Sequence, residues 1–170
     1  MHTLLTTLVG ALWLANPSAW AAPELIPEED ADLVGRTAPS FEAVTLDGDP
    51  FDLEAVRGKP VVLAFWASWC GPCRLELPAL SKLQAERDDI AIYAVNVDRD
   101  RRKADAFLRK IEVDLPVVWD NQSVAMGQYD VLSMPTMFLL DAQGTVKLRK
   151  VGYSEQKGLT ELLTALEGLR

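Results

Sequence analysis

An uninterrupted apolar run, Val61–Trp66, is the feature of the sequence that most limits how the chain can fold. A run of this length between polar and turn residues is typical of a strand that is buried on both faces of a sheet. Two cysteines, Cys70 and Cys73, follow it directly, and the apolar spacing then becomes helical as far as about Arg87. The cysteine pair is therefore expected where a buried strand ends and a helix begins.

The rest of the chain alternates between strand and helix patterns. We expect strands at 41–46, 50–53, 90–97, 117–119, 136–140 and 145–151, and helices at 100–110, 123–128 and from Ser154 onward. A single helical turn is expected at 54–57. One stripe of leucines should be buried on the last helix: Leu159, Leu162, Leu163, Leu166 and Leu169. This order predicts an α/β fold, in which a mixed, partly parallel sheet carries helices on both faces behind an N-terminal β-hairpin.

The first 21 residues predict a signal peptide. Residues 3–15 are mostly apolar and uncharged, and two small residues, Ala19 and Ala21, frame a cleavage site after Ala21. The apolar run is shorter than the ~20 residues that a membrane-spanning helix needs, so no span is expected after processing. Because residues 1–3 lack Lys and Arg, an uncleaved membrane anchor or an interfacial helix stays open as the alternative. The signal predicts a location in the periplasm or another extracytoplasmic compartment.

Composition limits the classes of function. Hydrophobic residues make up 49% of the chain and charged residues 25%, which is typical of a globular domain. The formal net charge of −8 argues against a nucleic acid or an anionic membrane surface as partner. The only histidine, His2, lies in the signal segment, so the mature chain lacks Ser–His and Cys–His nucleophiles and the commonest metal ligand. We expect an acidic, proline-containing tether at 22–39 and one domain at 40–170, without a metal or cofactor.

The cysteine pair is the candidate reactive group. The first turn of a helix has unpaired backbone N–H groups and positive partial charge, which would stabilise a thiolate at Cys70. A thiolate is the nucleophile in disulfide exchange, and Cys73, one turn further on, can attack a mixed disulfide formed at Cys70. A structural disulfide is disfavoured because it would close a very short loop, and zinc because it usually needs four ligands. Two soft thiolates can also hold Cu(I), so a copper-handling protein remains an alternative.

Residues 66–73, with the sequence WASWCGPC, resemble the thioredoxin active site. Two further segments match: Met134-Pro135-Thr136 resembles the cis-proline loop of that superfamily, and Pro78 falls where thioredoxins have a proline in the active-site helix. The resemblance covers most of the chain from its first expected strand onward. It implies the thioredoxin fold and protein disulfide exchange without a soluble cofactor.

An exported branch of the superfamily, the TlpA/ResA-like proteins, is more similar still. Segments 46–48 and 51–53 resemble its opening hairpin, residues 97–129 resemble its extra β and α elements, and a signal segment is usual there. The resemblance implies a thiol-disulfide oxidoreductase that acts on disulfides of exported proteins. Its partner for re-reduction would be a membrane thiol donor. The Gly71-Pro72 pair between the cysteines is of the thioredoxin type and implies a low reduction potential.

Two differences between this sequence and the related families bear on the mechanism. Thioredoxins carry a buried Asp in the central strand where this chain has Ala64, so we expect Glu76 to accept the proton, three residues after Cys73 on the same side of the helix. Glu76 also matches an active-site glutamate of ResA-like proteins, and a solvated helix carboxylate is the alternative. The glycine-valine-proline-glutamate stretch before the cis-proline in the CcmG group is replaced here by residues 130–134, which read DVLSM. This difference weakens a specific assignment to cytochrome c maturation, which stays open as one role of such a reductase.

The expected catalytic residues are therefore Cys70 as attacking thiolate, Cys73 as resolving thiol and Glu76. A substrate-binding surface is expected around them, formed by Trp69, Gly71, Pro72, Met134 and Pro135. The side chains of Trp69 and Met134 would form an apolar rim. The cis-proline would bring backbone polar groups close to the attacking cysteine, where an extended substrate can pair with them.

Other conspicuous residues are expected to be structural. The aromatic side chains of Phe65, Trp66 and Phe138 should lie in the core, and residues 98–103 should cap and solvate the start of a helix. A disulfide reductase is the favoured function. An oxidase or isomerase differs from it only in reduction potential, and a thiol peroxidase is disfavoured because the motif lacks an isolated activated cysteine.

Overall fold

The structure, a computed structural model, describes residues 33–169. The expected signal peptide and residues 22–32 of the expected tether lie outside the described residues. The described elements are β1 Glu42–Thr45, β2 Pro50–Asp52, β3 Val61–Trp66, α1 Cys73–Glu86, β4 Ala91–Asn96, α2 Arg101–Leu108, β5 Val117–Trp119, α3 Val124–Gln128, β6 Thr136–Leu140, β7 Val146–Val151 and α4 Thr160–Glu167. Strands β3, β5 and β6 have the bounds expected from the sequence. Between residues 33 and 169, no helix is long and apolar enough to cross a membrane.

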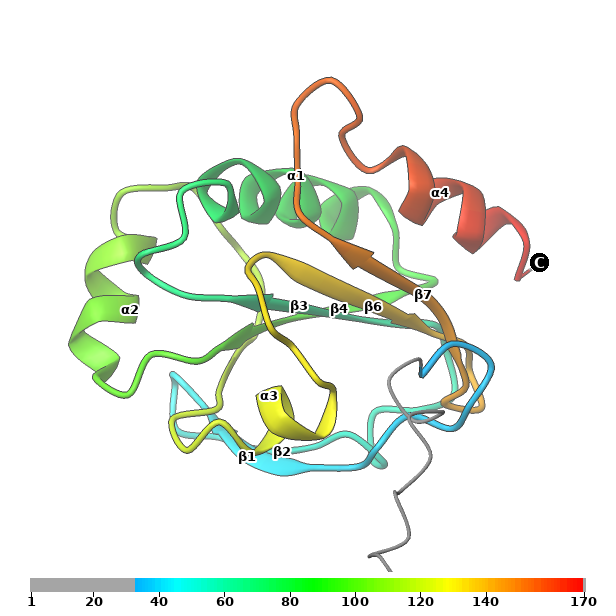
Figure 1. The fold of residues 1–170 in the computed structure, drawn as a ribbon, viewed down its shortest axis with the longest axis horizontal. Coiled ribbons are helices and arrows are strands. Elements are labelled where there is room, and N and C mark those ends of the chain that lie inside the picture. The colour runs from blue at the N-terminus through cyan, green and yellow to red at the C-terminus, as the bar shows by residue number, and fades with distance from the viewer. Residues whose placement is uncertain (1–32, 170) are drawn as a thin grey trace, which may run out of the picture. The chain divides into compact units, whose positions relative to one another are not determined.

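A mixed sheet in the order β2-β1-β5-β4-β3-β6-β7 is the framework of the described chain (Figure 1). The strand β3 lies inside it, parallel to β4 on one side and antiparallel to β6 on the other. Every residue of β3 is buried, because both faces of this strand are covered. The mixed α/β fold expected from the sequence is confirmed.

The N-terminal hairpin and the central insert extend the sheet on the β4 side. The strand β1 pairs antiparallel with β2 and, along its other edge, with β5. The strand β5 is parallel to β4 and lies between α2 and α3 in the chain. The expected opening hairpin and β/α insert are both present, and they meet through the pairing of β1 with β5.

Helices cover both faces of the sheet. Figure 1 shows α1 and α4 on one side of it and α3 on the other. The side with α1 and α4 holds an apolar cluster that includes Cys70, Cys73 and, from α4, Leu162. The other side holds a cluster with these aromatic residues: Phe41, Phe51, Phe65, Tyr129 and Phe138. The cysteine pair therefore lies between the sheet and the face covered by α1 and α4.

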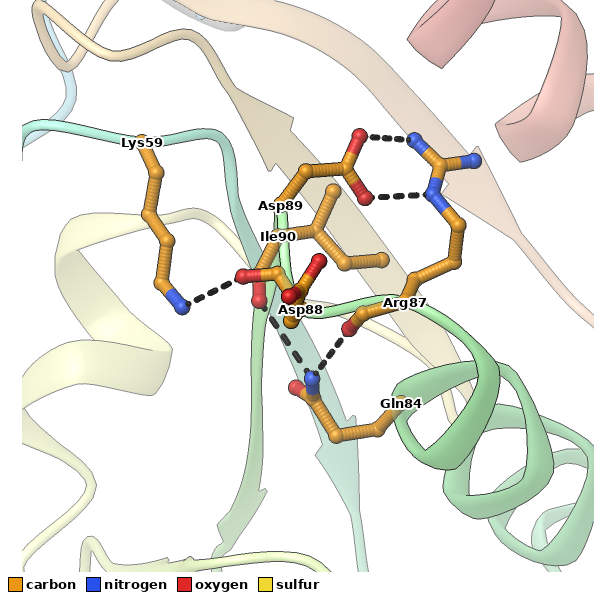
Figure 2. Close-up of polar contacts among 6 residues, drawn as sticks. All are labelled: Lys59, Gln84, Arg87, Asp88, Asp89 and Ile90. Carbon is orange, nitrogen blue, oxygen red and sulfur yellow. Dashed lines mark hydrogen bonds and ion pairs between the residues drawn. The ribbon is translucent and has the colours of Figure 1, made fainter.

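Side-chain hydrogen bonds hold the turn between α1 and β4 (Figure 2). Gln84 Nε2 donates to the carbonyl oxygens of Arg87 at 2.8 Å and Ile90 at 3.3 Å. From the segment before β3, Lys59 Nζ donates to the carbonyl oxygen of Asp88 at 3.1 Å. These bonds satisfy carbonyl groups of the turn that follows α1 and hold this turn against the end of the helix and the segment before β3.

Three expectations about helices are wrong. The last helix begins at Thr160 rather than at Ser154, since Gly158 has a φ of +49°, which does not occur inside a right-handed helix. Its Leu163 is 38% exposed, because so short a helix buries only a narrow face. Residues 54–57 form an isolated hydrogen-bonded turn that is not helical.

Fixed contacts begin before residue 40, within the segment expected to be a tether. The backbone N–H of Gly35 donates to the carbonyl oxygen of Val146 at 2.8 Å, and that of Ala38 to Gly144 at 2.8 Å. In return, the N–H of Val146 donates to the carbonyl oxygen of Arg36 at 2.9 Å. The end of that segment is thus paired with the start of β7.

Candidate active site

The two cysteines form a disulfide at the start of α1, with their Cα atoms 5.4 Å apart. Cys73 is the first residue of the helix, and its backbone N–H donates to Cys70 Sγ at 3.2 Å. Cys73 is fully buried and Cys70 is 3% exposed, whereas Gly71 and Pro72 between them are exposed. The helix start therefore supplies a hydrogen-bond donor to the sulfur that is expected to carry the thiolate charge.

A buried carboxylate holds the loop that leads to Cys70. Asp98, just after β4, accepts hydrogen bonds from the backbone N–H of Ser68 at 2.7 Å and from Ser68 Oγ at 2.9 Å. Asn96 Nδ2 donates to the same carboxylate at 2.9 Å, and Trp119 Nε1 donates to the Asp98 carbonyl oxygen at 2.7 Å. Asp98 is only 5% exposed, so the Ser68 and Asn96 donors replace the water that its carboxylate would otherwise bind.

Sequence reasoning missed this role of Asp98. The helix cap expected within 98–103 is Asp100, whose side chain accepts from the N–H of Arg102 at 3.0 Å. A usable signal was present in the sequence, because Asp98 follows a buried strand as directly as Ser68 follows another. If these two strands are parallel neighbours, as β3 and β4 are, the residues after them meet at one edge of the sheet.

The cis-proline expectation is confirmed, since the Met134–Pro135 peptide bond is cis. Pro135 directly precedes β6, whose first residue, Thr136, pairs with Phe65 near the end of β3. The loop therefore lies at the edge of the sheet where the chain leaves β3 for the cysteines. Thr136 Oγ1 donates to the carbonyl oxygen of Ser133 at 2.8 Å, and the Pro135 carbonyl accepts from the N–H of Gly152 at 2.7 Å.

The two side chains of the expected apolar rim differ in exposure. Trp69 is 70% exposed and remains the candidate for contact with a substrate. Met134 is partly buried and packs against both apolar clusters, including the one that contains the cysteines. Leu132, in the cis-proline loop, is 83% exposed and was not expected from the sequence. The three aromatic side chains that were expected in the core are fully buried: Phe65, Trp66 and Phe138.

Glu76 is the buried acid of the site. It is 1% exposed, and within residues 33–169 neither of its carboxylate oxygens has a hydrogen-bond partner. Burial raises the pKa of Glu76 from 4.5 to about 8, and the positive charge of Lys150 opposes this effect. A carboxyl group with this pKa can take up and release a proton close to neutral pH. The alternative of a solvated helix carboxylate does not hold.

The position that bears an acid in thioredoxins is apolar here. Ala64, in β3, is fully buried and pairs with Met137 of β6 and Ala94 of β4. The buried carboxyl group of this chain, Glu76, therefore lies on the helix α1, whereas that of thioredoxins lies on the central strand. Among the described residues, 33–169, no group of three or more His, Cys, Asp and Glu side chains is arranged to hold a metal ion.

A thioredoxin-type sheet that carries a cysteine pair at a helix start, beside a cis-proline, is the arrangement of thioredoxin-fold thiol-disulfide oxidoreductases. Comparison with known proteins agrees with this class. Residues 34–149 match the AhpC/TSA family, and the chain belongs to this family. The thiol-disulfide oxidoreductase ResA of Geobacillus thermodenitrificans is 31% identical over 166 residues, which cover 96% of this chain and 95% of that protein.

Solved structures lead to the same class. A Chlorobium tepidum protein assigned as thiol:disulfide interchange protein DsbE has a TM-score of 0.72 and 36% identity, and the match covers 78% of this chain and 97% of that one. A secreted Mycobacterium tuberculosis disulfide oxidoreductase, homologous to DsbE of E. coli, has a TM-score of 0.63 and 29% identity, with 76% and 96% covered. The chain is thus a thiol-disulfide oxidoreductase similar to ResA and DsbE.

Proposed function

We propose that the chain reduces disulfides in exported proteins, in the periplasm or another extracytoplasmic compartment. The observation that carries the proposal is the Cys70–Cys73 pair at the start of α1, with the buried carboxyl group of Glu76 one turn further along the helix. The expected signal peptide and the similarity to a secreted disulfide oxidoreductase support the location. The Gly71-Pro72 pair, which resembles that of thioredoxins, supports the reductive direction.

The reaction has two exchange steps. In the reduced protein, the Cys70 thiolate attacks one sulfur of a substrate disulfide, a mixed disulfide forms, and the other substrate sulfur leaves as a thiolate. Glu76 then takes the proton of the Cys73 thiol, and the Cys73 thiolate attacks Cys70 Sγ. The bond between Cys70 and the substrate breaks, the second substrate thiolate leaves, and the internal disulfide closes. Two electrons have then passed from the cysteine pair to the substrate.

The proton affinity of Glu76 suits this step. Its pKa of about 8 is close to the ~8.5 of a free cysteine thiol, so a proton moves between the two groups at little cost in free energy. An exposed glutamate, with a pKa near 4.3, would be a much weaker base for the same thiol. Burial of Glu76 therefore makes it a useful acceptor.

The oxidised pair must be reduced again by another dithiol. We propose a membrane thiol donor as this partner, and disulfide-containing exported proteins as substrates. No soluble cofactor enters either exchange, because electrons pass only between sulfur atoms and the proton passes from Cys73 to Glu76.

The reduction potential of the Cys70–Cys73 pair tests the direction of electron flow. It is measured by equilibration with glutathione or dithiothreitol buffers, in the full chain. A potential at or below about −230 mV, in the range of thioredoxin and glutaredoxins, supports a reductase that needs an electron source. A potential near about −120 mV, like that of DsbA, would make the protein a donor of disulfides and overturn the proposal.

Trapping experiments test the roles of the two cysteines. Cys73→Ser should accumulate a mixed disulfide with an oxidised protein substrate, because the resolving thiol is missing. Cys70→Ser should accumulate none, and the opposite pattern would exchange the two roles. Non-reducing electrophoresis distinguishes these outcomes.

Two finer assignments need separate tests. N-terminal sequencing of the exported protein should find Ala22 first, and a chain that still starts at Met1 would contradict cleavage of the signal. A specific role in cytochrome c maturation has no support from residues 130–134, which lack the CcmG sequence. Rapid reduction of an oxidised Cys-x-x-Cys-His peptide, relative to other disulfide peptides, would support that role.

A further inference from the structure

A buried ammonium group lies on the same side of the sheet as Glu76. The side chain of Lys150, in β7, is only 6% exposed. Its Nζ donates to the carbonyl oxygen of Gly158 at 3.0 Å, and Glu161 Oε1 is 3.9 Å away with its side chain half exposed. One neutral acceptor, one distant and half-exposed carboxylate, and the ring of Tyr153, whose centroid lies 6.0 Å from Nζ, are weak compensation for a buried ammonium group.

The sheet register places Lys150 on the face that carries α1 and α4, where its own contacts are with α4 and the segment before it. Met137 pairs with Lys150 on one side and with Ala64 on the other, so the three side chains form a row across β7, β6 and β3. Residues paired in an antiparallel sheet point to the same face. Ala64 and Met137 belong to the apolar cluster that also contains Cys73, from the first turn of α1. Lys150 therefore belongs to the face of the sheet on which the buried side of α1 rests.

Electrostatic interactions link Glu76 with this row. The positive charge of Lys150 lowers the pKa of Glu76, against the larger effect of burial. The pKa of Tyr153, two residues after β7, is raised by burial first and then by the negative charges of Glu76 and Glu155. Lys150 and Tyr153 also line a surface cavity of about 240 Å³, next to Glu161.

The other groups around Glu76 offer no equivalent cation. On its own helix, the guanidinium of Arg74 lies over the ring of Phe107, 4.6 Å from the ring centroid, and its side chain is exposed. The residues that β3 and β6 contribute to the row, Ala64 and Met137, are uncharged. Next to α4, Lys157 lines the same surface cavity as Lys150 and is exposed. Lys150 is the buried cation of this face among the described residues.

We propose that Lys150 is a positioning residue of the exchange reaction, whose buried ammonium group is the counter-charge of the Glu76 carboxylate. This proposal rests on the proposed function, in which Glu76 takes the proton of Cys73. In that step the proton moves from Cys73 Sγ to Glu76, the Cys73 electron pair forms the bond to Cys70 Sγ, and the substrate sulfur leaves. Lys150 transfers neither proton nor electrons; it stabilises the form of Glu76 that accepts the proton.

The expected effect is a shift in the titration of Glu76. A nearby positive charge favours the charged form of a carboxyl group, so loss of the Lys150 charge should raise the pKa of Glu76. In Lys150→Met, which keeps the length and apolar stem of the side chain, the midpoint of the Glu76 titration should rise by more than about 0.3 pH unit. Lys150→Arg should restore the wild-type midpoint, because it restores the charge.

The titration is measured directly, without turnover. Carboxyl carbon NMR of the oxidised full chain, with Glu76→Gln to assign the signal, follows Glu76 from pH 4 to pH 10. Lys147→Met is the matched control on the same strand, since Lys147 is exposed and pairs with Asp141 at 3.2 Å. It should leave the midpoint unchanged. Lys150→Gln, which keeps a donor for the Gly158 carbonyl, replaces Lys150→Met if the latter does not fold.

Each outcome decides the proposal. A rise in Lys150→Met or Lys150→Gln that Lys150→Arg reverses supports it. A midpoint within about 0.3 unit of wild type in the neutral variants, or an equal rise in Lys147→Met, overturns it. The pH profile of mixed-disulfide resolution gives a second readout, which should shift with the midpoint. If the midpoint shifts but the wild-type protein reduces no disulfide, the proposed function fails while the pairing of Lys150 with Glu76 stands.

Discussion

The buried carboxyl group of Glu76 makes a sharp prediction about stability and pH. In the folded protein its pKa is about 8, compared with an ordinary value of 4.5, because burial penalises the charged form. Between these two pH values the folded chain holds a proton at this site that the unfolded chain has lost. The contribution of Glu76 is therefore fully favourable below pH 4.5 and is lost as pH rises to 8.

The magnitude follows from the size of the shift. A difference of 8 − 4.5 = 3.5 units, at about 1.4 kcal/mol per unit, corresponds to a loss of roughly 5 kcal/mol of stability across this range. Glu76→Gln keeps the shape of the side chain but removes the titration. Relative to the variant, the wild-type protein should lose most of these 5 kcal/mol between pH 5 and pH 9.

The assay is urea denaturation of the oxidised proteins at several pH values in this range. Comparison with the variant removes the pH dependence that both proteins share. Glu86→Gln is the control, since it makes the same chemical change on the same helix at a side chain that is 61% exposed. Its difference from wild type should stay within about 0.5 kcal/mol at every pH. If the free energy of unfolding of Glu76→Gln depends on pH in the same way as that of the wild-type protein, the pKa of Glu76 is not raised on folding. The account of its burial is then refuted.

Three further predictions concern the loop, the rim and the α4 face. Asp98→Ala leaves both Ser68 donors without their acceptor and should lower the free energy of unfolding by about 3 kcal/mol, whereas a loss below 1 would show that the loop is held by other contacts. Trp69→Ala should barely alter stability because the side chain is 70% exposed, yet raise KM for a protein disulfide about tenfold. An equal effect on a small-molecule disulfide would contradict a docking role. Leu162→Ala should cost about 3 kcal/mol in urea denaturation and Leu163→Ala less than about 1; equal costs would contradict the observed burial.

Much of the fold was predictable from local patterns in the sequence. The strand Val61–Trp66 was predictable from its apolar run, because a strand covered on both faces excludes polar side chains along its whole length. The cis peptide before Pro135 was predictable by resemblance alone, since no local physical rule selects it. The start of α4 was not predictable, because the left-handed backbone at Gly158 leaves no trace in the leucine spacing. Leu163 shows the same limit: spacing defines a stripe, and the width of the contact decides which members are buried.

The sequence by itself determined the chemistry of the site. A cysteine pair at the start of a helix is a short-range property of the chain, as is a glutamate one turn after Cys73. Only the tertiary structure decided the environment of these groups. The positive charge of Lys150 acts on Glu76, and Ser68 donates to Asp98, although the sequence separates each pair by tens of residues. Proton affinity and loop position depend on burial and on such distant neighbours, because desolvation and charge act through space and not along the chain.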